Sequence, residues 1–254
     1  MLANTTAEKL REMKMTTMAA RLQTQEQSND VSALSFEDRL GLLVDEEYNA
    51  RKSNRLKRLL RLAGFAYPGA CLEDVEYRAD RQLDKALITR LGSGGYIGDH
   101  RHIVLLGAAG SGKSYLACAF GTAACREFRT VKYVRLPELM AEFAVAHAEG
   151  TFRKMLKSLG RIDLLILDEW LLYPLQDSES RDLLELMERR YQKASTIFCS
   201  QFDVGGWRGK LGQETLAEAI IDRIVHDAYT IKIAGDDSMR KHKGLATAGG
   251  TQSA

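Results

Sequence analysis

The sequence lacks several features that would place it in a particular class of protein. Its four cysteines form no C-x-x-C pair and three of them fall in apolar segments, so we expect reduced thiols instead of disulfides or metal ligands. No apolar run approaches the roughly 20 residues that a membrane-spanning helix needs, so we expect no membrane partner. The first nine residues lack the apolar core of a signal peptide. Together these absences favour a cytoplasmic location.

The overall composition is that of an ordinary soluble globular protein. Hydrophobic residues make up 45% of the chain and charged residues 28%. The formal net charge of +2 says little about partners, so only the distribution of charge along the chain is informative. The five histidines show no metal-ligand spacing. A length of 254 residues suggests one large domain, or one core with a smaller module.

Residues 107–114 read GAAGSGKS and match the phosphate-loop pattern G-x-x-x-x-G-K-[ST], the Walker A motif. An apolar run over 102–106 precedes the motif and an alanine-rich helix pattern follows it, as the pattern requires. Backbone N–H groups and the helix N-terminus would surround phosphate oxygens, and Lys113 would reach the outer phosphates. We therefore predict a nucleotide-phosphate site; the alternative is a glycine-rich turn. Its expected residues are Gly107, Ala108, Ala109, Gly110, Ser111, Gly112, Lys113, Ser114 and Tyr115.

Strand and helix patterns alternate from His102 onward, whereas the first hundred residues are mostly of helical type. The alternation predicts an α/β core in which helices flank both faces of a parallel sheet. A small all-helical module would precede this core. The expected strands lie at 102–106, 131–135, 164–167, 196–200 and 229–233.

A second motif, the Walker B type, closes the predicted strand at 162–170, which reads IDLLILDEW. Asp168 is expected to hold Mg²⁺ together with Ser114, and Glu169 to polarise a water in line with the γ-phosphate. An acidic pair that caps an exposed strand end is the alternative. A small-molecule kinase has little use for a water-activating glutamate, so the pair favours hydrolysis of ATP over phosphoryl transfer to a metabolite.

The predicted strand at 196–200 also ends in polar side chains, Ser200 and Gln201. If this strand lies between those of the phosphate loop and of the acidic pair, Ser200 or Gln201 can contact the γ-phosphate or the attacking water. A turn-forming Ser-Gln pair is the alternative. We take Gln201 as a candidate catalytic residue.

These motifs stand in one order with two further segments, residues 216–228 (LAEAIIDRIVHDA) and 238–241 (SMRK). In this combination the chain resembles the IstB family of AAA+ ATPase helper proteins, which insertion sequences encode and which are related to the DnaC helicase loaders. The segments 58–65 and 72–75 also look like the family's linker, so the resemblance covers nearly the whole chain. It implies an AAA+ P-loop core that binds ATP and Mg²⁺.

The resemblance also implies roles for two arginines. Arg223 would be an arginine finger that completes the ATP site of a neighbouring subunit, and Arg240 a second sensor of the γ-phosphate within its own chain. Guanidinium groups suit both roles, because charge spread over the transferring phosphoryl oxygens needs fixed cations. Without the resemblance, each arginine would be taken as a surface ion-pair partner.

The chain departs from the family in one place. The family commonly follows its acidic pair with Trp-Gly, whereas Trp170 here precedes Leu171 and, further on, Pro174. The added bulk puts the loop after Glu169 in doubt, so the assignment of Asp168 is firmer than that of Glu169.

By resemblance, the protein would bind duplex DNA with weak sequence selectivity, form a homo-oligomer on it with ATP, and deliver it to the transposase of the same element. A run of basic residues gives local support, because its cations could follow a phosphate backbone while leucines face inward. A solvated helix face or a subunit contact is the alternative. The run consists of Arg51, Lys52, Arg55, Lys57, Arg58 and Arg61.

We therefore expect a helical module at 1–68 for DNA or partner contact, an AAA+ ATPase core at 69–242 and a disordered tail at 243–254. Three other functions remain as alternatives. A DnaC-like replicative helicase loader would share the core but have a helicase as its partner. A DNA scaffold would assemble and bend DNA with almost no turnover, and a small-molecule kinase would act as a monomer on a metabolite.

Overall fold

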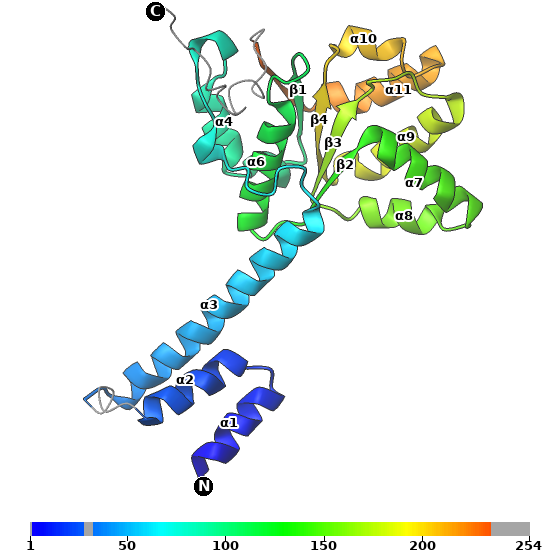
Figure 1. Cartoon of the computed structure of the whole chain (residues 1–254). Coiled ribbons are helices and arrows are strands. Elements are labelled where there is room, and N and C mark those ends of the chain that lie inside the picture. Colours follow the sequence, from blue (N-terminus) through cyan, green and yellow to red (C-terminus); the bar gives the residue numbers. More distant parts are fainter. Residues whose placement is uncertain (1, 28–32, 235–254) are drawn as a thin grey trace, which may run out of the picture. The chain divides into compact units, whose positions relative to one another are not determined.

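The computed structural model describes residues 2–27 and 33–234 (Figure 1). Two compact units, residues 1–58 and 59–254, divide inside the long helix α3 (Phe36–Ala63). The functional boundary expected at residue 68 stays a prediction. The tail expected at 243–254 lies outside the described residues.

The first unit consists of α1 (Leu2–Glu12), α2 (Thr16–Gln27) and most of α3. Glu47 of α3 fastens these helices together: one of its carboxylate oxygens accepts 3.0 Å hydrogen bonds from the backbone N–H groups of Thr17 and Met18. The carboxylate thereby caps the first turn of α2, whose N–H groups have no partner within the helix. Hydrogen bonding from Arg51 contributes most to the lowered pKa of Glu47.

The second unit contains a five-stranded parallel sheet in the order β2-β3-β4-β1-β5. The parallel sheet predicted from the alternating pattern is therefore confirmed. Because parallel strands end at the same edge, the segments that follow β1, β3 and β4 all leave from one side of the sheet. The strands are β1 (His102–Leu106), β2 (Val131–Arg135), β3 (Leu164–Trp170), β4 (Ser195–Ser200) and β5 (Ala228–Lys232).

Helices cover both faces of this sheet, as Figure 1 shows for α6 on one side and α7 on the other. Side chains alternate between the two faces along each strand. Ile166 faces α6, where it lies against Gly121. Leu165 and Leu167 belong to the buried cluster that α7, α9 and α11 complete. The helices are α4 (Lys85–Gly92), α5 (Gly95–Gly98), α6 (Lys113–Arg126), α7 (Leu136–Ala148), α8 (Phe152–Leu159), α9 (Asp177–Arg190), α10 (Val204–Arg208) and α11 (Glu214–Val225).

Within the part of the chain that the structure describes, no helix is both long enough and apolar enough to cross a membrane. The same residues contain no group of three or more His, Cys, Asp or Glu side chains arranged to hold a metal ion.

Candidate nucleotide-binding site

The loop between β1 and α6 owes its shape to glycines. Gly112, which caps α6, has a φ of 93°, a left-handed conformation that favours glycine. Gly107, the residue after β1, lies so close to Ile233 that an added Cβ would be 2.7 Å from the Ile233 carbonyl oxygen. The backbone therefore turns sharply out of the strand and into the helix, and the first N–H groups of α6 point toward the loop.

Lys113 begins α6 and turns its side chain back into the loop. Its exposed fraction is 7%, and its Nζ donates hydrogen bonds to the carbonyl oxygens of Gly107 (2.8 Å) and Ala108 (2.7 Å). Burial lowers the pKa of Lys113, and the nearby Asp168 carboxylate only partly opposes this shift. A phosphate in the loop would compensate the ammonium charge far better than two neutral carbonyl oxygens do.

Asp168 lies near Lys113 at the carboxyl end of β3 and is 5% exposed. Tyr133 of the neighbouring strand β2 donates a 2.6 Å hydrogen bond to its Oδ2, and the N–H of Glu169 donates to its Oδ1 at 2.8 Å. Burial, and then the bond to Asp168, raise the pKa of the Tyr133 phenol. Sequence reasoning missed Tyr133, which the pairing of β2 with β3 brings to the carboxylate.

Glu169 is held by an arginine. Arg135, at the end of β2, donates from one Nη to both carboxylate oxygens of Glu169 at 2.7 Å each, and from the other to Glu138 at 3.0 Å. Glu169 has a φ of 53°, and the pairing of β3 with β4 shifts register between Leu167 and Trp170. This bulge aims the glutamate at Arg135. No pattern in the sequence pointed to that ion pair.

The two candidate residues at the polar end of β4 differ in burial and in hydrogen bonding. β4 lies between β1 and β3, which is the condition under which this end can contact a γ-phosphate. The Ser200 hydroxyl is fully buried, accepts from Phe202 N (3.1 Å) and Trp207 Nε1 (3.0 Å), and donates to Phe202 O at 2.8 Å. Ser200 is thus occupied in holding the following turn. Gln201 is exposed beyond the strand end.

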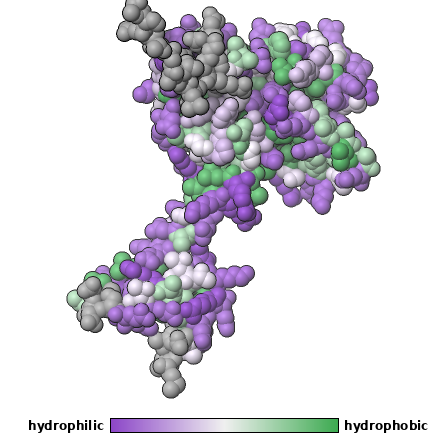
Figure 2. Space-filling model, viewed as in Figure 1, coloured by the Kyte–Doolittle hydropathy of each residue, from purple (hydrophilic) through white to green (hydrophobic). Residues whose placement is uncertain are grey.

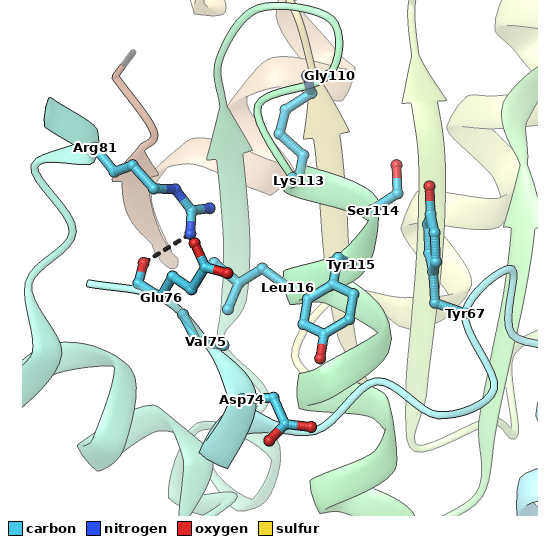
Figure 3. Close-up of a pocket in the computed structure, with 11 residues that line it drawn as sticks. Tyr67, Asp74, Val75, Glu76, Arg81, Gly110, Lys113, Ser114, Tyr115 and Leu116 are labelled. Atoms are coloured by element: carbon cyan, nitrogen blue, oxygen red, sulfur yellow. Dashed lines mark hydrogen bonds between the residues drawn. The ribbon is translucent and has the colours of Figure 1, made fainter. Parts of the chain in front are cut away.

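A cavity of about 380 Å³ opens beside the phosphate loop, within the usual size range of small-molecule sites. Figure 3 shows that one wall comes from the loop and α6, and another from the linker that precedes the sheet. The sequence prediction included the loop residues but missed the linker wall. The linker residues are Tyr67, Asp74, Val75, Glu76 and Arg81.

Residues 5–246 match the family model described as IstB-like ATP binding protein. The insertion sequence ATP-binding protein y4pL of Sinorhizobium fredii is 40% identical over 96% of this chain and 99% of its own length. The ATP-binding protein of insertion sequence IS1162 from Pseudomonas fluorescens is 39% identical over 79% of this chain and 87% of its own. The chain belongs to the IstB-like ATP-binding protein family. The resemblance seen in the sequence is therefore confirmed.

Solved structures with the same fold include a helicase loader and a DnaA protein. The DnaC helicase loader superposes with a TM-score of 0.55 at 21% identity, over 66% of this chain and 98% of DnaC. DnaA from Aquifex aeolicus, solved with AMPPCP, superposes with a TM-score of 0.58 at 18% identity, over 71% of this chain and 56% of that one. These likenesses confirm the predicted AAA+ P-loop core.

The backbone just after Trp170 adopts a conformation that glycine takes most easily. Leu171 has a φ of 51°, a conformation in which a Cβ is strained. Leu171 and Trp170 are nonetheless fully buried, and Trp170 packs against Phe198 and Trp207 with ring centroids 4.6 and 5.6 Å apart. Burial of the Leu171 side chain stabilises by about 1.5–3 kcal/mol, which is enough to offset the roughly 1–2 kcal/mol of strain.

The structure describes only one of the two arginines that the family resemblance singled out. Arg223, near the end of α11, donates to the Ala219 carbonyl at 2.7 Å and forms a 3.0 Å ion pair with Glu188 of α9. Its side chain is 28% exposed, so the guanidinium is accessible at the surface. Arg240 lies outside the described residues.

The basic run lies along α3, and its six cations are all exposed. Figure 2 shows a predominantly hydrophilic surface over this part of the helix. Arg51 has a structural contact as well, because it donates to Glu47 at 2.7 Å and to the Lys14 carbonyl at 3.0 Å. The other five are Lys52, Arg55, Lys57, Arg58 and Arg61.

Proposed function

We propose that the protein is the ATP-dependent DNA-binding helper of an insertion sequence. In this proposal it assembles on target DNA with ATP and delivers that DNA to the transposase of the same element, and hydrolysis resets the assembly. The observation that carries the proposal is the site itself: buried Lys113 and Asp168 lie near each other at a glycine loop, and Lys113 also lines a cavity of about 380 Å³, in a chain of the IstB-like family.

The residues present fit a Mg²⁺ ion bound with the triphosphate. Asp168 offers a buried carboxylate and Ser114 a hydroxyl in the first turn of α6, and both are hard oxygen donors. Mg²⁺ usually takes only one or two protein oxygens and completes its coordination with phosphate and water, which agrees with so small a donor set. When bound, the ion would neutralise charge on the phosphate oxygens. Tyr133 and the Glu169 N–H fix the orientation of the carboxylate.

The hydrolytic step would be performed by Glu169, which polarises the attacking water, with Gln201 in contact with that water or with the γ-phosphate. Glu169 can do so only when its carboxylate oxygens are not both occupied by Arg135. Lys113 would bind the outer phosphates, and Arg223 of one subunit would complete the site of the next. Its guanidinium is partly exposed near the end of α11, which supports that role.

Duplex DNA would bind along the basic residues of α3. Exposed cations on successive turns of one helix can neutralise several phosphates without reading bases, so binding should be weakly sequence-selective and salt-sensitive.

The proposal is tested with Lys113→Ala, and with Lys193→Ala as a matched control at an exposed lysine outside the site. Loss of Lys113 removes the cation that faces the outer phosphates, so ATP binding and ATP-dependent assembly on duplex DNA should both be abolished. The control should bind as the wild type does. Titration calorimetry with ATP measures the first effect and light scattering the second. Undiminished ATP affinity in Lys113→Ala would refute the site assignment.

A helicase loader remains the second candidate, because DnaC shares the fold. The relatives near 40% identity are named for insertion sequences, which favours the transposition context. Co-purification decides between the two: the helper should retain a transposase encoded beside it, whereas a loader should retain a replicative helicase.

A further inference from the structure

A buried arginine lies in the linker wall of the cavity, outside every motif that the sequence analysis identified. Arg81 ends the short 3₁₀ helix η3 (Ala79–Arg81) and is 6% exposed. Figure 3 shows its guanidinium between Glu76 of the linker and the side of the cavity where Lys113 lies. It lines the same cavity as the phosphate loop.

The contacts of Arg81 connect three segments that are distant in the sequence. Its Nη1 donates to the carbonyl oxygen of Glu76 at 2.7 Å, and its Nη2 donates to that of Ser111 at 3.1 Å. Its own carbonyl oxygen accepts from the N–H of Ala234, just beyond β5, at 3.1 Å. The planar guanidinium therefore fixes the position of the phosphate loop at Ser111 relative to the linker.

The charge of Arg81 is balanced only in part, by the nearby carboxylates of Glu76 and Asp80. Among residues 2–27 and 33–234, no carboxylate forms an ion pair with it, although Glu76 and Asp80 are close enough to act at longer range. Burial lowers its pKa, so the folded protein bears a cost for keeping this cation inside. An anionic ligand beside the loop would reduce that cost.

We propose that Arg81 is a positioning residue for the triphosphate: its guanidinium holds the phosphate loop at Ser111 in the shape that receives a polyphosphate, and adds a second buried positive charge to that of Lys113. This role rests on the proposed ATP site and concerns residues that the Walker motifs do not contain. The residue acts through the loop, so its loss affects nucleotides with several phosphates more than those with one.

The experiment measures the affinities of the full-length protein for Mg-ATP and for AMP in four forms: wild type, Arg81→Met, Arg81→Lys and Arg78→Met. Methionine approximates the apolar stem of the arginine but removes the charge and the donors. Lysine keeps the charge but lacks the planar fork with which two separate nitrogens of Arg81 reach the carbonyl oxygens of Glu76 and Ser111. Arg78 is the matched control, because it lies in the same segment and pairs with Asp80. Melting temperatures without nucleotide are recorded for all four.

Arg81→Met should weaken ATP binding by about tenfold or more, because the phosphate loop loses its tie to the linker and the triphosphate loses a nearby buried positive charge. AMP binding should weaken less, so the ratio of the ATP affinity to the AMP affinity should fall. Arg81→Lys should also lower that ratio, and Arg78→Met should leave it unchanged. Arg81→Met removes a buried charge but also leaves the carbonyl oxygens of Glu76 and Ser111 without their donor, so the melting temperature without nucleotide should change only modestly.

Two results would overturn the role of Arg81. One is wild-type ATP affinity in either folded Arg81 variant; the lysine form decides if the methionine form does not fold. The other is an equal loss of ATP and AMP affinity together with a lowered melting temperature, which is what a purely structural residue would give. Failure of the wild type itself to bind ATP is a separate readout and would refute the proposed function.

Discussion

Individual residues of the site are held by side chains from neighbouring strands, and the most consequential contact is that between Arg135 and Glu169. Both oxygens of the glutamate accept from one guanidinium, so the group expected to polarise water is occupied by an ion pair. Arg135 is 46% exposed, and ion pairs of this exposure contribute at most about 1 kcal/mol. A contact of that strength can be displaced when nucleotide or a partner subunit reshapes the site.

Arg135→Ala should therefore raise the rate of ATP hydrolysis measured without DNA, by up to about fivefold, because it frees the Glu169 carboxylate. The rate is measured as phosphate release at saturating ATP. Glu138→Gln is the matched control: it removes the other carboxylate partner of Arg135, leaves the pair with Glu169, and should not raise the rate. Adding Glu169→Gln to Arg135→Ala should abolish hydrolysis. An unchanged or lowered rate in Arg135→Ala would show that this pair does not restrain Glu169.

The sequence predicted the loop residues and Asp168 as candidates because each belongs to a local pattern that can be read without the fold. Tyr133, Arg135 and Arg81 belong to no such pattern. They reach the site through strand pairing and through the path of the linker, and neither can be deduced from spacing along one chain. The choice between Ser200 and Gln201 likewise required the turn beyond β4, where Trp207 and Phe202 occupy the serine hydroxyl.

At the scale of elements, the strands were predicted within a few residues, and the main difference is the end of β3. The apolar run ends at Leu167, yet the strand continues to Trp170 because a bulge inserts the acidic pair and then returns the tryptophan to the core. An alternation pattern cannot show a bulge, since the bulge breaks the alternation. Helix α3 is likewise much longer than the basic run at 51–61 that the sequence singled out.

The basic run along α3 supports a prediction at this scale. Replacing Arg55, Lys57, Arg58 and Arg61 by glutamine should weaken duplex binding and lower the slope of log affinity against log salt by about 0.9 for each DNA phosphate that is no longer neutralised. Fluorescence anisotropy at several salt concentrations measures both. A control of equal charge change replaces Arg129, Arg153, Lys193 and Arg208 by glutamine; all four are exposed on the second unit.

The control variant should keep nearly the wild-type slope of log affinity against log salt concentration. If the α3 variant keeps the wild-type slope, DNA binds elsewhere on the molecule. Arg51 is left out of the set because it donates to Glu47 and to the Lys14 carbonyl, so its removal would disturb the first unit.

At the scale of the whole molecule, the proposal requires that one subunit complete the ATP site of another. Arg223→Ala should keep ATP binding but lose hydrolysis. Mixing it with Lys113→Ala should restore part of the activity, because some mixed interfaces combine an intact Lys113 with an intact Arg223. Steady-state ATPase rates of the two variants, alone and mixed, measure this.

Glu188→Gln is the matched control, since it removes the partner of Arg223 within the chain and leaves the arginine in place. It should retain hydrolysis. Absence of any recovery in the mixture would count against a shared site and would leave Arg223 as a partner of Glu188 alone.

The most direct test is the mass of the wild-type particle in solution, measured by light scattering with ATP and duplex DNA added singly and together. If one protomer completes the ATP site of the next on DNA, the particle mass should rise well above that of one 28.4 kDa chain with its DNA. The rise should be largest when ATP and DNA are both present. A well-folded sample that remains monomeric under every condition and binds no adenine nucleotide would contradict the account.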